Sequence, residues 1–159
     1  MSESKNARVG IKIANDYCGK CTICSSVCPY EAISTDEKTG EVILDVERCQ
    51  LCGICFSACP TSAIETAYYN PNLLTNYVKR SMQEKGLKTL VLTCRGGGPL
   101  HNGIADALKR RNINDFISLR LPCVGRVPIE FLLSALALGL DRLVVMPCEE
   151  DFCRFKRGN

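Results

Sequence analysis

Eight of the twelve cysteines in this 159-residue chain follow one spacing twice. The runs are Cys18, Cys21, Cys24 and Cys28 before Pro29, and Cys49, Cys52, Cys55 and Cys59 before Pro60. Thiolates at the spacing C-x2-C-x2-C-x3-C-P bind [4Fe–4S] clusters, which carry single electrons. A disulfide framework would need an oxidising compartment, and the N-terminus shows no signal peptide. Zinc usually takes two C-x2-C pairs separated by a longer loop. The sequence therefore predicts two [4Fe–4S] clusters.

The cysteine before each proline is expected to bind the cluster of the other run. A tight loop can supply three thiolates to one cluster, and the next cysteine then points away from that loop, as in two-cluster ferredoxins. The first thiol set is Cys18, Cys21, Cys24 and Cys59. The second thiol set is Cys49, Cys52, Cys55 and Cys28. Because the two sets interlock, neither half should fold well without both clusters.

The two runs belong to an internal repeat with an offset of 31 residues, which aligns Cys18 with Cys49. The same offset aligns Ile11 and Ile13 with Val42 and Leu44, which predicts a short strand before each loop. The polar residues 35–40 predict a turn between the halves. Each half is thus a strand, a cluster loop, a short helix and a return strand. Residues 8–68 resemble the dicluster ferredoxin fold, which is of the α+β class.

The other four cysteines lie in a second, more apolar half. Apolar strands at 89–93, 116–121 and 143–146 alternate with amphipathic helices, which predicts an α/β domain with a short parallel sheet (βαβαβ). One cysteine follows each strand, and the carboxyl ends of parallel strands form the edge where ligands bind. A further cysteine lies in the last loop. The third thiol set is Cys94, Cys123, Cys148 and Cys153.

A shared iron–sulfur centre is the interpretation that we favour for the third thiol set. A redox dithiol or disulfide, a zinc site and inert buried cysteines are the alternatives. Residues 95–98, Arg-Gly-Gly-Gly, lack the spacing of a phosphate-binding loop and suit backbone pressed close to a cluster. His101 is expected in solvent or at a helix cap, and Arg126 could offset cluster charge.

The second half also resembles a known family over residues 92–159. The resemblance rests on Cys94-Arg-Gly-Gly, Pro122-Cys-Val-Gly-Arg-Val127, and Cys148-x4-Cys153 followed by Gly-Asn. It looks like the iron–sulfur delta subunit of methyl-viologen-reducing hydrogenase, sometimes fused to a dicluster ferredoxin. The resemblance implies a [2Fe–2S] cluster and a heterodisulfide-reductase-type, electron-bifurcating flavoprotein as partner. The other partner would be a hydrogenase or formate dehydrogenase subunit of an anaerobic, hetero-oligomeric complex.

Three segments are therefore expected: a ferredoxin domain at 1–70, a connecting helix at 71–86, and a delta-subunit-like domain at 87–159. The net charge of +3 comes without the basic stripe of a nucleic-acid-binding protein. No segment approaches the ~20 apolar residues of a membrane span, so we expect a cytoplasmic protein. We predict an electron-transfer subunit with no independent catalytic site. The alternative is a thiol–disulfide oxidoreductase in which the ferredoxin half feeds Cys148 and Cys153.

Overall fold

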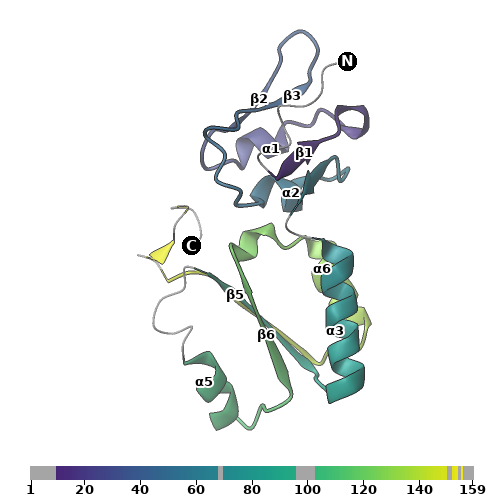
Figure 1. Cartoon of the computed structure of the whole chain (residues 1–159), viewed down its shortest axis with the longest axis vertical. Coiled ribbons are helices and arrows are strands. Elements are labelled where there is room, and N and C mark those ends of the chain that lie inside the picture. The colour runs from purple at the N-terminus through teal and green to yellow at the C-terminus, as the bar shows by residue number, and fades with distance from the viewer. Residues whose placement is uncertain (1–9, 68–69, 96–102, 150–151, 154, 156–159) are drawn as a thin grey trace. The chain divides into compact units, whose positions relative to one another are not determined.

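The computed structural model describes residues 10–67, 70–95, 103–149, 152, 153 and 155. These residues form two compact units, one ending at Asn70 and the other beginning at Pro71 (Figure 1). Across the described ranges, no helix combines the length and the apolar character that a membrane crossing requires.

The first unit is built from two copies of one strand–helix–strand motif. Strand β1 (Ile11–Ile13), helix α1 (Ile23–Ser26) and strand β2 (Ile33–Thr35) form the first copy. Strand β3 (Val42–Leu44), helix α2 (Ile54–Ala58) and strand β4 (Ile64–Thr66) form the second. The offset that aligns the cysteines therefore also aligns the strands and the starts of the helices. The repeated strand, short helix and return strand predicted from the sequence are confirmed.

The strands pair in a way that closes the two copies around one core. Strand β1 pairs antiparallel with β4, and β2 pairs antiparallel with β3. The first residue of every strand is buried, and these four side chains pack with two cysteines. The core comprises Ile11, Ile33, Val42, Ile64, Cys24 and Cys55. Small domains with so few core residues usually need disulfides, bound metal or oligomerisation for stability.

The second unit holds a three-stranded parallel sheet in the order β6-β5-β7. The strands are β5 (Thr89–Cys94), β6 (Phe116–Leu121) and β7 (Arg142–Met146). The central strand β5 is buried at every position, as expected for a strand covered on both faces. The sequence placed Cys94 after this strand, whereas it is the last residue of β5. The parallel sheet itself is confirmed.

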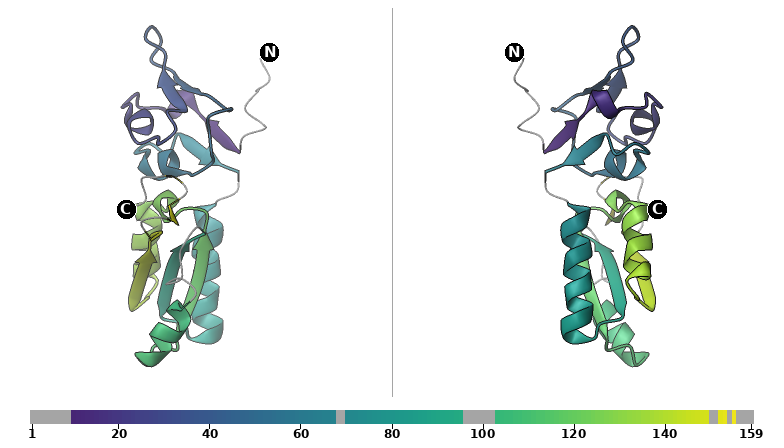
Figure 2. Two further views of the ribbon diagram at one scale, coloured as in Figure 1. Left: turned by 90° about the vertical axis from the view of Figure 1, so that its left-hand side faces the viewer. Right: turned by 90° about the vertical axis from the view of Figure 1, so that its right-hand side faces the viewer.

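Helices cover both faces of this sheet. Helix α5 (Ile104–Arg110) lies on one side of the strands, and α6 (Ile129–Ala137) and α3 (Pro71–Lys85) lie on the other (Figures 1 and 2). Helices α3 and α6 are in contact. Helix α3 ends at Lys85, and the next residue, Gly86, has a φ of +64° and donates its N–H to Met82 O, as is typical of a glycine after a helix C-terminus. Residues 71–85 therefore pack as part of the second unit.

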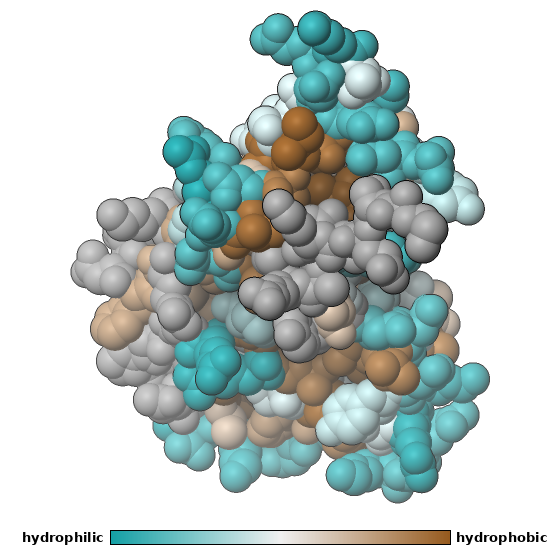
Figure 3. All heavy atoms as spheres, turned by 45° about the horizontal axis from the view of Figure 1, so that its top comes forward, coloured by the Kyte–Doolittle hydropathy of each residue, from teal (hydrophilic) through white to brown (hydrophobic). Residues whose placement is uncertain are grey.

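Several large apolar side chains reach the surface, where brown and teal residues alternate in the view of Figure 3. In the first unit Tyr17 is 75% exposed. In the second unit Ile129 and Leu133 on α6 are 58% and 59% exposed. Their i, i+4 spacing places them on one face of that helix.

Candidate iron–sulfur sites

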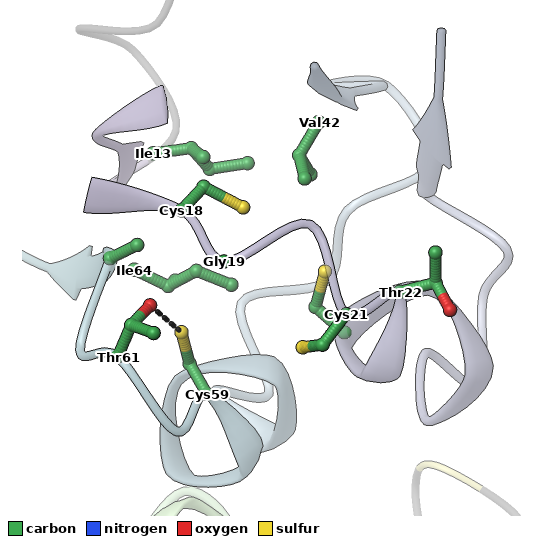
Figure 4. Close-up of a pocket in the computed structure, with 11 residues that line it drawn as sticks. Ile13, Cys18, Gly19, Cys21, Thr22, Val42, Cys59, Thr61 and Ile64 are labelled. Carbon is green, nitrogen blue, oxygen red and sulfur yellow. Dashed lines mark hydrogen bonds between the residues drawn. The ribbon is translucent and has the colours of Figure 1, made fainter. Parts of the chain in front are cut away.

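The eight cysteines of the first unit surround two separate pockets. The thiols that line the first pocket are Cys18, Cys21, Cys24 and Cys59. The thiols that line the second pocket are Cys28, Cys49, Cys52 and Cys55. Figure 4 shows Cys18, Cys21 and Cys59 approaching the first pocket from two different loops. Each pocket thus takes three thiols from one run and the fourth from the other run.

The loops carry the same backbone irregularities in both copies. Lys20 and Thr22 have φ of +52° and +61°, and the aligned residues Leu51 and Gly53 have φ of +56° and +80°. Only Gly53 adopts this left-handed conformation without a steric cost. The bends turn backbone N–H groups toward sulfur: Lys20 N–H donates to Cys18 Sγ at 3.4 Å. The loops therefore present both thiols and hydrogen-bond donors to the pockets.

Burial favours the protonated form of several of these thiols in the metal-free chain. It raises the pKa of Cys55 to about 12, with added repulsion from Cys52, Cys49 and Cys28. Burial also raises the pKa of Cys24, although a backbone N–H of Ser25 opposes it. Cluster binding must therefore displace protons from this unit.

Cys59 is different from the other thiols of the first set. Burial raises its pKa, but a stronger group of hydrogen bonds lowers it below the usual value. The Thr61 hydroxyl lies 3.6 Å from Cys59 Sγ (dashed line in Figure 4), and backbone groups of Thr61, Ala63 and Ile64 add to it. Sequence reasoning missed Thr61. A comparison of the two copies could have revealed it, because Tyr30 occupies the equivalent position in the first copy.

The third thiol set also converges, as the positions of its members at the sheet edge suggest. A hydrogen bond from the Cys123 thiol lowers the pKa of Cys94, and Val124 N–H at 3.3 Å and the Cys148 thiol act in the same direction. Burial, together with the neighbouring Cys94 and Cys153, raises the pKa of Cys148. Cys94 and Cys123 are buried, and Cys148 and Cys153 are half-buried. The interactions thus run from Cys123 to Cys94, from Cys94 to Cys148 and from Cys148 to Cys153, and each of the four cysteines has at least one other as a neighbour.

Arg126 follows Cys123 on the short 3-10 helix η3 (Val124–Arg126) and is only 4% exposed. Arg120 Nη2 donates to Arg95 O at 2.9 Å, which links Arg95, the residue after β5, to strand β6. The glycines at 96–98 and His101, for which the sequence suggested roles, lie outside the described residues.

The four thiols of each pocket in the first unit are distributed around that pocket. Within the described part of the chain, no three His, Cys, Asp or Glu side chains are grouped so that they could hold one metal ion. A cluster of four irons places its thiolate ligands at four separate corners, so it requires a wider spread of sulfurs than one ion. In each pocket of the first unit the thiols are accompanied by apolar side chains, such as Ile13, Val42 and Ile64 in the first.

Comparisons with known proteins agree with this division. Residues 17–63 match the family described as "4Fe-4S dicluster domain". The first unit is therefore similar to iron–sulfur ferredoxins of the dicluster type. Residues 101–159 match the family described as "Methyl-viologen-reducing hydrogenase, delta subunit". Both resemblances seen in the sequence are confirmed.

A curated relative points the same way. The chain is 44% identical over 41 residues to an iron–sulfur subunit of the F420-non-reducing hydrogenase of Archaeoglobus profundus. The match covers 26% of this chain and 30% of that protein. The chain thus matches less than a third of the length of this relative.

Proposed function

We propose that this chain is an iron–sulfur electron-transfer subunit of a hydrogenase-associated complex. The observation that carries the proposal is the pair of pockets in the first unit, each lined by four cysteine thiols drawn from both copies of the repeat. The first thiol set holds one [4Fe–4S] cluster and the second thiol set holds the other. Such clusters supply a one-electron carrier at each pocket.

The chain would position the thiols around each cluster, stabilise the negative charge on sulfur and exclude water from the inner side of each pocket. Helices α1 and α2 place one buried cysteine each, Cys24 and Cys55, beside the pockets. Apolar residues of the strands exclude water from the inner side of each pocket. Backbone N–H groups of the loops donate to sulfur and stabilise negative charge there.

For the third thiol set we propose a [2Fe–2S] cluster held by Cys94, Cys123, Cys148 and Cys153. The convergence of these thiols at the carboxyl ends of three parallel strands supports a shared centre. Arg126 is buried and its backbone N–H donates to Cys123 O at 3.4 Å, and a positive charge in this region would suit a centre with four thiolates. The nuclearity follows from the family resemblance.

The partners follow from the same resemblance. We propose that the chain connects a hydrogenase or formate dehydrogenase subunit to a heterodisulfide-reductase-type flavoprotein, in the cytoplasm of an anaerobe. Both matched families consist of components of redox proteins. A carrier of single electrons must lie close to its donor and its acceptor, so a hetero-oligomeric complex is expected.

A second function is favoured by one observation. The lowered pKa of Cys94, caused first by the Cys123 thiol, is also typical of thiol–disulfide exchange sites. In that case the first unit would deliver electrons to a disulfide in the third thiol set, formed between Cys148 and Cys153.

Iron analysis of the anaerobically purified, full-length chain separates the two functions. The electron-transfer subunit should contain about 10 iron atoms, and the oxidoreductase about 8 together with a reducible disulfide. EPR spectroscopy should show reducible clusters in either case. A chain that binds no iron would rule out both functions.

A further inference from the structure

We infer that the two [4Fe–4S] clusters are unequal, and that Thr61 and Lys20 give the cluster of the first thiol set the higher reduction potential. The inference rests on the proposed function, since it concerns how this chain adjusts the clusters that it holds. It comes from comparing the two copies of the repeat position by position. Features that both copies share cannot give the two clusters different reduction potentials, so only the positions at which the copies differ are relevant.

Many donors to sulfur are common to both copies. The backbone N–H of Lys20 donates to the sulfur of Cys18, and the backbone N–H of the aligned Leu51 donates to the sulfur of Cys49. Ala32 N–H donates to Cys28 Sγ at 3.4 Å, and a backbone group of Ala63 serves Cys59 in the same way. These shared hydrogen bonds raise both potentials and leave no difference between the clusters.

The Thr61 hydroxyl is an additional donor at the first thiol set. It lies 3.6 Å from Cys59 Sγ, and a thiolate can only accept, so the hydroxyl must donate. Tyr30 occupies the aligned position and carries its hydroxyl at the far end of an aromatic ring. A donor to a cluster sulfur stabilises the reduced, more negative form, and this raises the reduction potential.

Lys20 adds a positive charge to the same loop. Its Nζ donates to Thr39 O at 2.6 Å, so the ammonium is anchored by a neutral carbonyl in the turn between β2 and β3. Leu51 is the aligned residue, and it packs against the apolar core. The first loop therefore has a cation where the second loop has a hydrocarbon.

The greater exposure of a cysteine in the first thiol set should also raise the reduction potential of its cluster. Cys21 is exposed, whereas the aligned Cys52 is 7% exposed. Water stabilises the more negative form, so the more exposed cluster is reduced more easily. Arg48, next to Cys49, acts in the opposite direction, but its Nε lies 3.6 Å from Asp45 Oδ2, so its charge is largely compensated.

The test is an anaerobic redox titration of the full-length, cluster-loaded chain, followed by EPR. The wild type should show two different midpoint potentials for its [4Fe–4S] signals. Thr61→Val and Lys20→Leu should each lower the higher midpoint and leave the lower one in place. At a fixed solution potential, the reduced fraction of the first signal should fall several-fold. Added salt should weaken the Lys20→Leu effect more, because a surface charge is screened.

Ser26→Ala is the matched control. The Ser26 hydroxyl donates to the carbonyl of Thr22 at 3.2 Å, so the variant removes a hydroxyl of helix α1 that donates to backbone oxygen. Both midpoints should stay where they are. Equal midpoints in the wild type, or a fall of the lower midpoint in Thr61→Val, would overturn the inference. Either result leaves the proposed function intact, because the clusters would still be counted by iron analysis.

Discussion

At the scale of single residues, the pocket that a cysteine lines does not always belong to its own run. Cys28 is the clearest example, because it is close in sequence to the first thiol set but lines the pocket of the second. Cys59 belongs to the second run but lines the pocket of the first thiol set. The thiol that completes each pocket therefore comes from the other run, and this relation can be tested.

Substitution of these two cysteines should affect opposite clusters. Cys28→Ala should cost about four iron atoms and the EPR signal of the cluster beside Cys49, Cys52 and Cys55. Cys59→Ala is the matched variant and should remove the other signal. The two signals can be told apart by their midpoint potentials. Loss of the higher-potential signal in Cys28→Ala would contradict the exchange of ligands between the runs.

The raised pKa of Cys55 should make cluster assembly depend on pH. A proton competes with iron for this thiol at every pH below about 12. The pKa is raised in the folded chain, so the protonated form is favoured and proton release opposes assembly more strongly as the pH falls. Anaerobic reconstitution of the metal-free chain should therefore be faster and more complete at pH 9 than at pH 7. A yield independent of pH would contradict this expectation.

At the scale of elements, the turn between β2 and β3 matters beyond its own hairpin. Asp36 Oδ1 accepts hydrogen bonds from Lys38 N–H and Thr39 N–H at 2.9 and 2.7 Å, and these bonds lower its pKa. The turn so ordered presents Thr39 O to Lys20. Gly40 completes it with a φ of +69°. The turn therefore supports the loop of the first thiol set from outside.

Gly40→Ala should weaken this support. A side chain at φ +69° costs about 1–2 kcal/mol, and its Cβ would lie 3.0 Å from Lys20 Cδ. Gly86→Ala is the control, because its φ of +64° carries a similar cost but nothing lies within 4 Å. Thermal melting should show destabilisation in both variants. Only Gly40→Ala should also lower the higher midpoint potential, and an unchanged midpoint would show that the Lys20 contact has no electrostatic role.

At the scale of the whole molecule, the chain is divided between Asn70 and Pro71. Helix α3 buries Val78 and Ser81 and contacts α6 within the second unit. The connecting helix expected at 71–86 corresponds to α3, and its assignment as a segment separate from the second domain stays a prediction. As a packed element, it belongs in any fragment of the second unit.

A fragment that begins at Pro71 should therefore fold and bind about two iron atoms after anaerobic reconstitution. A fragment that begins at Gly86 lacks the helix that covers part of α6, so it should melt at a lower temperature and bind less iron. Iron analysis and circular dichroism of the two fragments measure both effects. A folded, colourless Pro71 fragment with four free thiols would contradict the third centre.

The sequence was sufficient to predict those elements whose positions depend only on the spacing of residues along the chain. The cysteine runs and their shared offset placed β1 to β4 and the two thiol sets, because each half repeats the same local bends. It was insufficient for contacts made across the fold. The bond from Lys20 to Thr39 depends on how the hairpin folds back, and the contact between Thr61 and Cys59 depends on a side-chain rotamer. Neither leaves a periodic signal.

The crossing of thiols between the two copies has a consequence for synthesis. The first pocket needs Cys18 and Cys59, and the second needs Cys28 and Cys55, so neither is complete until the second run has been translated. A nascent chain that carries only the first copy would expose four reactive thiols and no finished site. Iron–sulfur delivery should therefore follow translation of the whole ferredoxin unit, and a ribosome stalled between the copies would leave a product vulnerable to oxidation and proteolysis.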